Sequence, residues 1–313
     1  VSNTKIVLKY SMNILGTRIN IFITLFDDED VDNYNVYKKK IKYIVVLLHF
    51  LLSKKNIVKK LDIYLCLVPI NKTLPENPID VLDKSNCNSG LSMLIGTGES
   101  ILLVYRREEW FKVLIHELIH CLHLDISFLS YQFLKKKLRE MYPIKSLFNV
   151  NETFTELLAN VLNISICSYL AMEKNDFDVY ILYKKTFLMM ERYFSLVQLN
   201  KILGFMNLSY EQLYEKDKMS DVSRLLYKER THVFSYYILK CVLLYHYNEF
   251  VLWCLKNDVS MVSHKNTKLL YAFSKFLELH YNSSRFLKDI EWVKKNHKKE
   301  NNGLRMTIVE MKF

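Results

Sequence analysis

The chain has 313 residues, half of them hydrophobic and a quarter charged, so it can bury a large core and form two lobes or one large domain. Its formal net charge of +11 comes almost entirely from Lys, because only nine positions are Arg. The Lys clusters are separated and lack Arg forks or interleaved Gly-aromatic motifs, so we expect solvated faces and no nucleic-acid partner. No uninterrupted apolar stretch reaches the roughly eighteen residues of a membrane helix, so no membrane span is expected.

Residues 1–105 carry the alternating apolar pattern of strands, interrupted by one helix. The helix is expected at Val31–Leu52, which has a broad apolar stripe. Gly96 and Gly98 suit the β-turn between the last two strands, and the addition of an extended peptide at this hairpin is the alternative use of the same residues. The expected strands are Lys5–Tyr10, Arg18–Phe26, Leu61–Val68, Leu91–Ile95 and Ser100–Tyr105.

From Asp125 to Leu287 the pattern is nearly all helical, with few Gly or Pro. We therefore predict an α+β chain in three parts. Residues 1–125 form a small N-terminal mixed β-sheet with helices, residues 126–290 form a mostly helical C-terminal lobe, and residues 291–313 form a basic tail.

One short motif carries most of the chemical information. Residues 116–120 read His-Glu-Leu-Ile-His, which matches H-E-x-x-H, inside an amphipathic run that we expect to be helical from Glu108 to Asp125, with acids in its first turn. On a helix, residues i and i+4 lie one above the other, so His116 and His120 can present two imidazoles to one zinc ion. Glu117 lies about 100° around the helix, where it can take a proton from the attacking water.

A second helical run, beyond the motif, offers a third ligand. Glu152 and Glu156 stand at i and i+4, so one of them can complete a two-His, one-carboxylate zinc site while the other hydrogen-bonds a ligand histidine. If Asn151 caps the helix, both acids share a face. If Thr153 is the cap, Glu152 falls outside the helix and Glu156 closes a capping box. We favour Glu152 as the ligand and keep Glu156 as the alternative.

These two segments resemble the gluzincin metallopeptidases, the thermolysin-like branch of the zincins, in which H-E-x-x-H is followed on a later helix by a glutamate ligand in an N-E-x-x-x-D or E-x-x-x-E setting. The resemblance implies a zincin-like fold in which His116, His120 and Glu152 bind zinc. It also implies that Glu117 is the catalytic base and that Glu156 orients one of the two histidines. The gap between the segments is longer here than in thermolysin itself.

The related metzincin pattern does not fit, because His123 and Ile126 stand where that pattern needs a glycine and a third histidine. His123 lies on nearly the same helical face as the two motif histidines. Three ligands from one straight helix would span about 10 Å, which is too far for one metal ion. We therefore expect His123 to pack or to support a ligand.

A hydrolase of this type also needs a donor for the oxyanion that develops during the reaction. His232 and Tyr236 stand at i and i+4 on an apolar helix, and polar side chains at such positions indicate a specific role. Tyr142 precedes Glu152 by ten residues, similar to the place where thermolysin-like enzymes carry a tyrosine. We favour His232 with Tyr236 over Tyr142.

The sequence therefore predicts a zinc-dependent metallopeptidase that acts on a peptide or protein substrate. Its six cysteines lack C-x-x-C spacing and lie mostly in apolar runs, and the N-terminus shows no secretory signal, so we expect an intracellular, cytoplasmic protein. One alternative is a catalytically silent zincin-fold protein that acts as a protein-interaction module, although such a protein need not retain Glu117. A basic nucleic-acid-associated protein with an incidental motif is the other.

Overall fold

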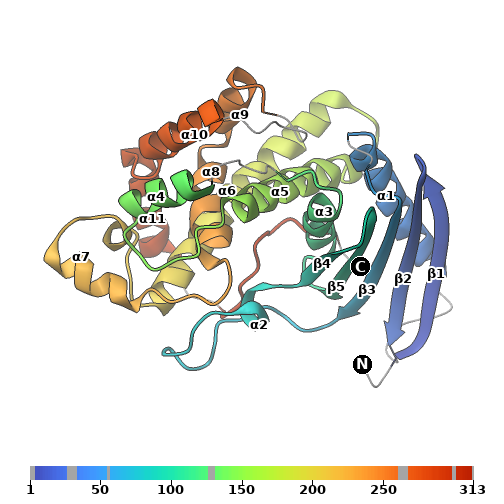
Figure 1. Ribbon diagram of the computed structural model, residues 1–313, viewed down its shortest axis with the longest axis horizontal. Helices are drawn as coiled ribbons and strands as arrows, with labels where there is room; N and C mark the ends of the chain where they lie inside the picture. Colours follow the sequence, from blue (N-terminus) through green and yellow to red (C-terminus); the bar gives the residue numbers. More distant parts are fainter. Residues whose placement is uncertain are drawn as a thin grey trace. The chain divides into compact units, whose positions relative to one another are not determined.

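The structure is a computed structural model that describes residues 4–26, 34–54, 57–125, 131–259, 267–297 and 301–311. It confirms an α+β chain with a five-stranded mixed sheet towards the N-terminus and a mostly helical remainder (Figure 1). Contacts group the chain into two compact units. The first unit comprises Val1–Asn71, Ser89–Asp125 and Met311–Phe313, and the second comprises Lys72–Asn88 and Ile126–Glu310.

The first unit is built on one sheet with the strand order β1-β2-β3-β5-β4. Strands β1 (Thr4–Ile14) and β2 (Thr17–Phe26) form an antiparallel hairpin, and β2 pairs in parallel with β3 (Lys60–Val68). Strand β3 pairs in parallel with β5 (Glu99–Arg106), which pairs antiparallel with β4 (Gly90–Ile95). All five predicted strands are confirmed, with β1 continuing to Ile14.

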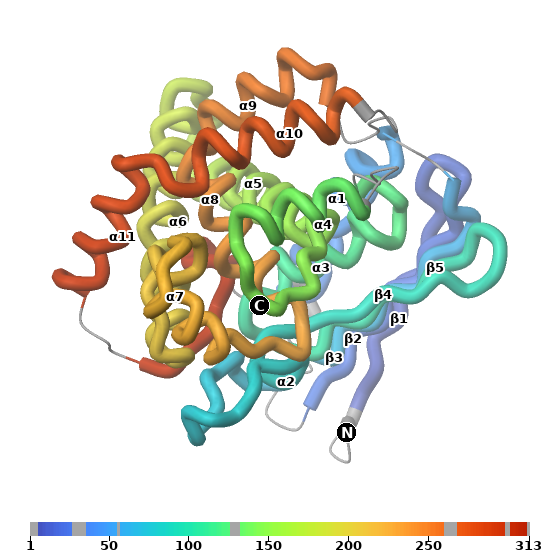
Figure 2. The backbone as a smooth tube through the Cα atoms, turned by 60° about the vertical axis from the view of Figure 1, so that its left-hand side comes forward, coloured from blue at the N-terminus to red at the C-terminus, as the bar shows by residue number. Residues whose placement is uncertain are grey.

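One face of this sheet is buried because every second residue of the central strands is apolar. Helices α1 (Tyr34–Leu52) and α3 (Trp110–Cys121) lie on this side (Figure 2). The predicted helix at Val31–Leu52 is thus confirmed from Tyr34 onward, and residues 31–33 lie outside the described residues. The buried side chains lie in register across the strands: Ile19, Ile21 and Ile23 of β2, Leu61, Ile63 and Leu65 of β3, and Ser100, Leu102 and Val104 of β5.

The turn between β4 and β5 is confirmed. Gly96 and Gly98 have φ angles of 65° and 86°, in the left-handed region that glycine adopts without strain. Strand β4 lies at one edge of the sheet.

The second unit is helical, as expected for Asp125 to Leu287, and its core is rich in aromatic side chains such as Tyr142, Phe154, Phe234 and Phe273. The stretch before Gly90 contains the short helix α2, which Asp83 caps by accepting a hydrogen bond from Ser85 N. The helical elements are α2 (Lys84–Cys87), α4 (Tyr131–Met141), α5 (Val150–Leu170), α6 (Phe177–Phe205), η1 (Glu211–Leu213), α7 (Lys218–Ser223), η2 (Arg224–Leu226), the π-helix η3 (Phe234–Leu239), α8 (Lys240–Tyr245), α9 (Tyr247–Lys256), α10 (Thr267–His280) and α11 (Ser284–Asn296).

The end of the chain differs from the predicted basic tail. Helix α11 continues to Asn296, residues 298–300 lie outside the described residues, and the segment that follows buries Leu304, Met306, Thr307 and Val309. Leu304 and Thr307 have no exposed surface. The segment from Leu304 to Met311 belongs to no named helix or strand, and its main chain bonds to side chains from other elements. Met311 belongs to the first unit, where its carbonyl accepts a hydrogen bond of 2.8 Å from Trp110 Nε1.

Within the described residues, no single helix has both the length and the hydropathy to cross a membrane. The stretches Phe234–Tyr245 and Tyr247–Lys256 reach that threshold only together, across a bend of 82°.

Candidate metal centre

Helix α3 carries the H-E-x-x-H motif and is held by packing rather than by a capped N-terminus. It begins at Trp110, so the prediction that acids occupy its first turn is wrong. Strand β5 continues through Arg106, and the turn that follows places Glu109 at the N-cap with a left-handed φ of 58° and no side-chain capping bond. Ten of the eleven residues Trp110–His120 are buried, and His120 is partly exposed. The buried helix therefore holds the motif residues in fixed positions.

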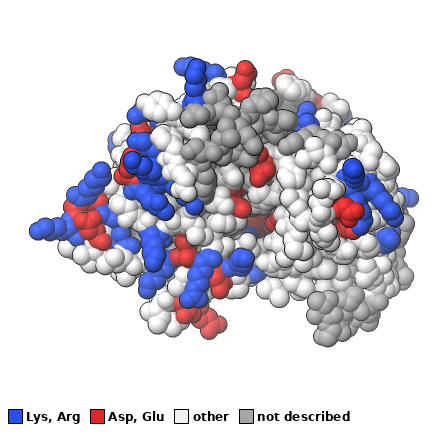
Figure 3. Space-filling model, viewed as in Figure 1, with Lys and Arg blue, Asp and Glu red and all other residues white. Residues whose placement is uncertain are grey.

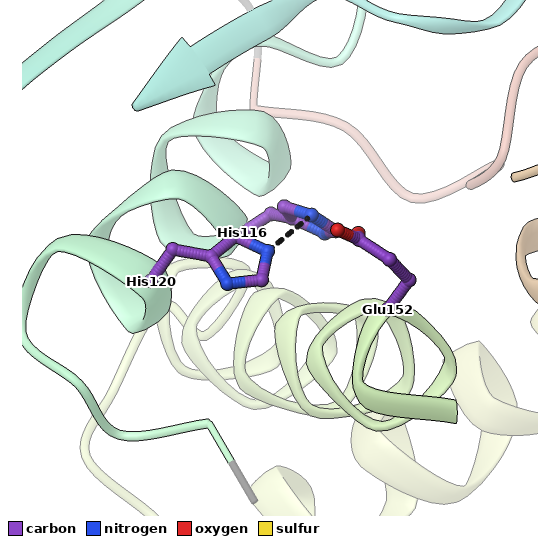
Figure 4. A group of neighbouring side chains, drawn as sticks. All are labelled: His116, His120 and Glu152. Atoms are coloured by element: carbon purple, nitrogen blue, oxygen red, sulfur yellow. Dashed lines mark hydrogen bonds between the residues drawn. The ribbon is translucent and has the colours of Figure 1, made fainter. Parts of the chain in front are cut away.

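The two motif histidines converge as metal ligands do (Figure 4). The Nε2 atoms of His116 and His120 lie 3.2 Å apart. Two nitrogens bound tetrahedrally to one zinc ion at the usual bond length would lie about 3.3 Å apart. The residues present thus fit a shared metal ion.

Asp125 supports His120 and was missed in the sequence. Its Oδ2 lies 3.6 Å from Nδ1 of His120, the nitrogen that faces away from His116. A carboxylate beside the second imidazole nitrogen fixes the orientation of a ligand histidine. The available signal was an acidic residue five positions after His120, directly behind the helix.

Glu117 is buried, and strand β4 passes close to it. A Cβ atom added at Gly90 would lie 2.9 Å from Cγ and 3.0 Å from Oε1 of Glu117. Only glycine leaves room for the carboxylate at this position. The sequence signal was weak, because a single glycine beside a strand has several uses.

The second unit supplies Glu152 from the first turn of α5. Asn149 is the N-cap, and its Oδ1 accepts a hydrogen bond from Glu152 N at 3.4 Å. Neither Asn151 nor Thr153 caps the helix, because the helix begins at Val150 and both lie inside it. Glu152 and Glu156 consequently share a helical face, which is the arrangement that the expected site needs.

Tyr236 and His232 lie near Glu152, in different roles from each other. Tyr236, in the π-helix η3, donates its hydroxyl to Oε2 of Glu152 at 3.0 Å, so it positions the carboxylate. His232 stacks edge-on against Tyr236, with ring centroids 6.0 Å apart. Its Nδ1 is buried and has no hydrogen-bond partner among the described residues. That nitrogen is therefore available to a bound molecule.

The positions of Tyr142 and His123 indicate structural roles. Tyr142 is fully buried in the core of the second unit, and its hydroxyl lies 2.5 Å from that of Tyr210. The alternative that assigned Tyr142 to catalysis is therefore not supported. His123 lies in the turn after α3 with a φ of 51°, so it leaves the helical face of His116 and His120.

Among the described residues, one group of three side chains has the ligand types and spacing to hold a metal ion. It consists of His116, His120 and Glu152, each offering one ligand atom, and these atoms lie within 4.8 Å of one another (Figure 4). Glu156 is not part of this group.

Burial makes two of the cysteines poor nucleophiles. All six are free thiols, and burial raises the pKa of both Cys87 and Cys121 to about 12. A thiol with so high a pKa is protonated and unreactive near neutral pH.

Comparisons of the chain with protein-family models, with curated proteins and with solved structures give no match. On the face of the molecule in Figure 3, Lys and Arg side chains are interspersed with Asp and Glu. That face is not a surface of a single charge sign. The candidate metal centre is therefore the feature from which function is argued.

Proposed function

We propose that this chain is a zinc-dependent metallopeptidase of zincin-like fold, with His116, His120 and Glu152 as metal ligands and Glu117 as general base. The observation that carries the proposal is the 3.2 Å separation of the two Nε2 atoms, with a buried glutamate between the two histidines in the sequence. The carboxylate of Glu152, held by Tyr236, supplies the third ligand type of a hydrolytic zinc site.

A bound zinc ion would supply Lewis acidity, polarising the peptide carbonyl and making water a better nucleophile. Glu117 takes the proton from the attacking water and returns it to the leaving amine. His232 donates to the oxygen on which negative charge develops. Its Nδ1, buried and without a hydrogen-bond partner in the part of the chain that the structure describes, supports this assignment.

The substrate we propose is a peptide or protein, and the six free thiols favour a reducing, intracellular compartment. The edge strand β4 is the proposed place for substrate backbone, because an edge strand offers unpaired main-chain groups to an extended peptide. A catalytically silent module has no structural observation in its favour, since Gly90 leaves space for the carboxylate of Glu117.

The test is the zinc content of purified protein, measured by plasma emission spectrometry, beside hydrolysis of a mixed quenched-peptide library. We expect about one zinc per chain in the wild type and in Glu117→Gln, and loss of zinc in Glu152→Ala. Glu156→Ala is the matched control, being one helical turn away on the same face of α5.

Three outcomes distinguish a zinc peptidase from a catalytically silent interaction module and from a protein without a metal site. Zinc binding with hydrolysis that Glu117→Gln lowers by about 10²-fold or more supports the peptidase. Zinc binding without hydrolysis of any peptide leaves the interaction module. Folded wild type that neither contains nor takes up zinc overturns the proposal.

A further inference from the structure

A buried carboxylate in the second unit binds the end of the chain. Glu191 of α6 has no exposed surface, and its Oε1 accepts hydrogen bonds from Ile308 N at 2.8 Å and Val309 N at 2.9 Å. The hydroxyl of Thr307 donates to the same oxygen. Burial raises the pKa of Glu191, while the nearby Lys240 ammonium and these donors oppose the rise. A carboxylate is buried in this way only where donors surround it.

Four carbonyls of the same segment accept hydrogen bonds from side chains of other elements. Residues 303–309 are therefore recognised through their main chain, as an extended peptide is recognised by a receptor. The donors are Lys201 Nζ to Gly303 O at 2.7 Å, Tyr237 Oη to Leu304 O at 2.7 Å, Lys240 Nζ to Met306 O at 3.1 Å and Asn163 Nδ2 to Val309 O at 2.8 Å.

The elements that bind this segment also place Glu152. Asn163 lies on α5, about three turns after Glu152. Tyr237 follows Tyr236 in the π-helix η3, so adjacent residues bind the segment and the Glu152 carboxylate respectively. If the segment left, buried donors on α5 and η3 would lose their acceptors, and these elements would rearrange to recover them.

We propose that residues 303–309 are a built-in peptide ligand of a receptor formed by α5, α6, η3 and the start of α8, and that their binding positions Glu152 for the metal. The metal part of this inference rests on the proposed function. Coupling between two binding events is reciprocal, so zinc must also tighten the segment in its receptor.

The experiment uses the full chain and two readouts. Hydrogen exchange of fragments covering residues 304–311 is followed by mass spectrometry with and without zinc, and zinc affinity is measured by competition with a chromophoric chelator. The variants are Asn163→Ala and the milder Lys201→Ala, which removes a half-buried donor and tests the idea if the first variant unfolds. Ser165→Ala is the control, because its hydroxyl donates to Val161 O within α5.

We expect zinc to slow exchange of the segment about tenfold, and both variants to bind zinc about tenfold more weakly, with the control within about twofold of the wild type. Exchange that zinc does not alter, with wild-type zinc affinity in folded variants, overturns the positioning role and leaves the proposed function standing. A wild type that binds no zinc overturns the proposed function first, and this inference with it.

Discussion

The hydroxyl of Tyr236 donates a hydrogen bond of 3.0 Å to Oε2 of Glu152. A tyrosine expected to meet the substrate thus holds the proposed third metal ligand. Tyr236→Phe removes this donor and leaves the packing, so we expect zinc affinity to fall about 10- to 100-fold. Chelator competition measures it, with the exposed Tyr271→Phe as control. Unchanged affinity in Tyr236→Phe would show that the bond does not serve the metal.

Gly90 makes room for Glu117. In Gly90→Ala the added methyl group would meet Cγ of Glu117 and Cγ1 of Val113, both at 2.9 Å, so the carboxylate must move. We expect zinc content to persist while kcat falls at least about tenfold, because a general base acts only within hydrogen-bond reach. Gly96→Asn is the control, since no atom of the described residues lies within 4 Å of a Cβ added there and Asn tolerates a left-handed φ. An unaffected kcat in Gly90→Ala counts against Glu117 as the base.

His232 offers a buried ring nitrogen without a partner among the described residues. If it stabilises the developing oxyanion, His232→Ala lowers kcat by about 10²- to 10³-fold and leaves zinc content unchanged. Steady-state kinetics with a quenched peptide, together with metal analysis, tests this. Loss of zinc in the variant would instead indicate a structural role.

The stability of the second unit should fall in mild acid because of His246. Burial, and then the nearby His280, lowers the pKa of His246 to about 4, and Glu249 opposes this. The unfolded chain binds the proton near pH 6.5 and the folded chain does not. The contribution of the neutral His246 to the free energy of unfolding is therefore fully present above about pH 6.5. It is lost as the pH falls towards 4, and the free energy of unfolding declines by about 2 kcal/mol after allowance for partial solvent access.

Urea unfolding between pH 7.5 and 4.5 measures this decline, and His246→Gln should flatten it. The exposed His49→Gln is the matched control, which should leave the pH dependence as in the wild type. The groups that face His246 from neighbouring elements are His280, Ser283 and Arg285, with Tyr245 and Glu249 beside it along the chain. An equal slope in wild type and His246→Gln would exclude this histidine as the cause.

The sequence by itself determined what depends on local periodicity. Helical hydrogen bonding sets residues four apart on one face, so the convergence of His116 and His120 followed from their spacing alone. Alternating apolar residues likewise determined the strands of the sheet, and a broad apolar stripe determined the helix that begins at Tyr34. These features need no information about distant parts of the chain.

Only the tertiary structure decided what depends on residues far apart in sequence. The cap at Asn149, the bond from Tyr236 to Glu152 and the burial of Tyr142 against Tyr210 each required long-range packing. The last segment was grouped with a basic tail because the charged stretch Lys294–Gly303 precedes it, yet Glu191 binds its main chain. Hydrogen bonds to main-chain groups do not depend on the side chains of the bound segment, which is the physical reason that the sequence did not reveal them.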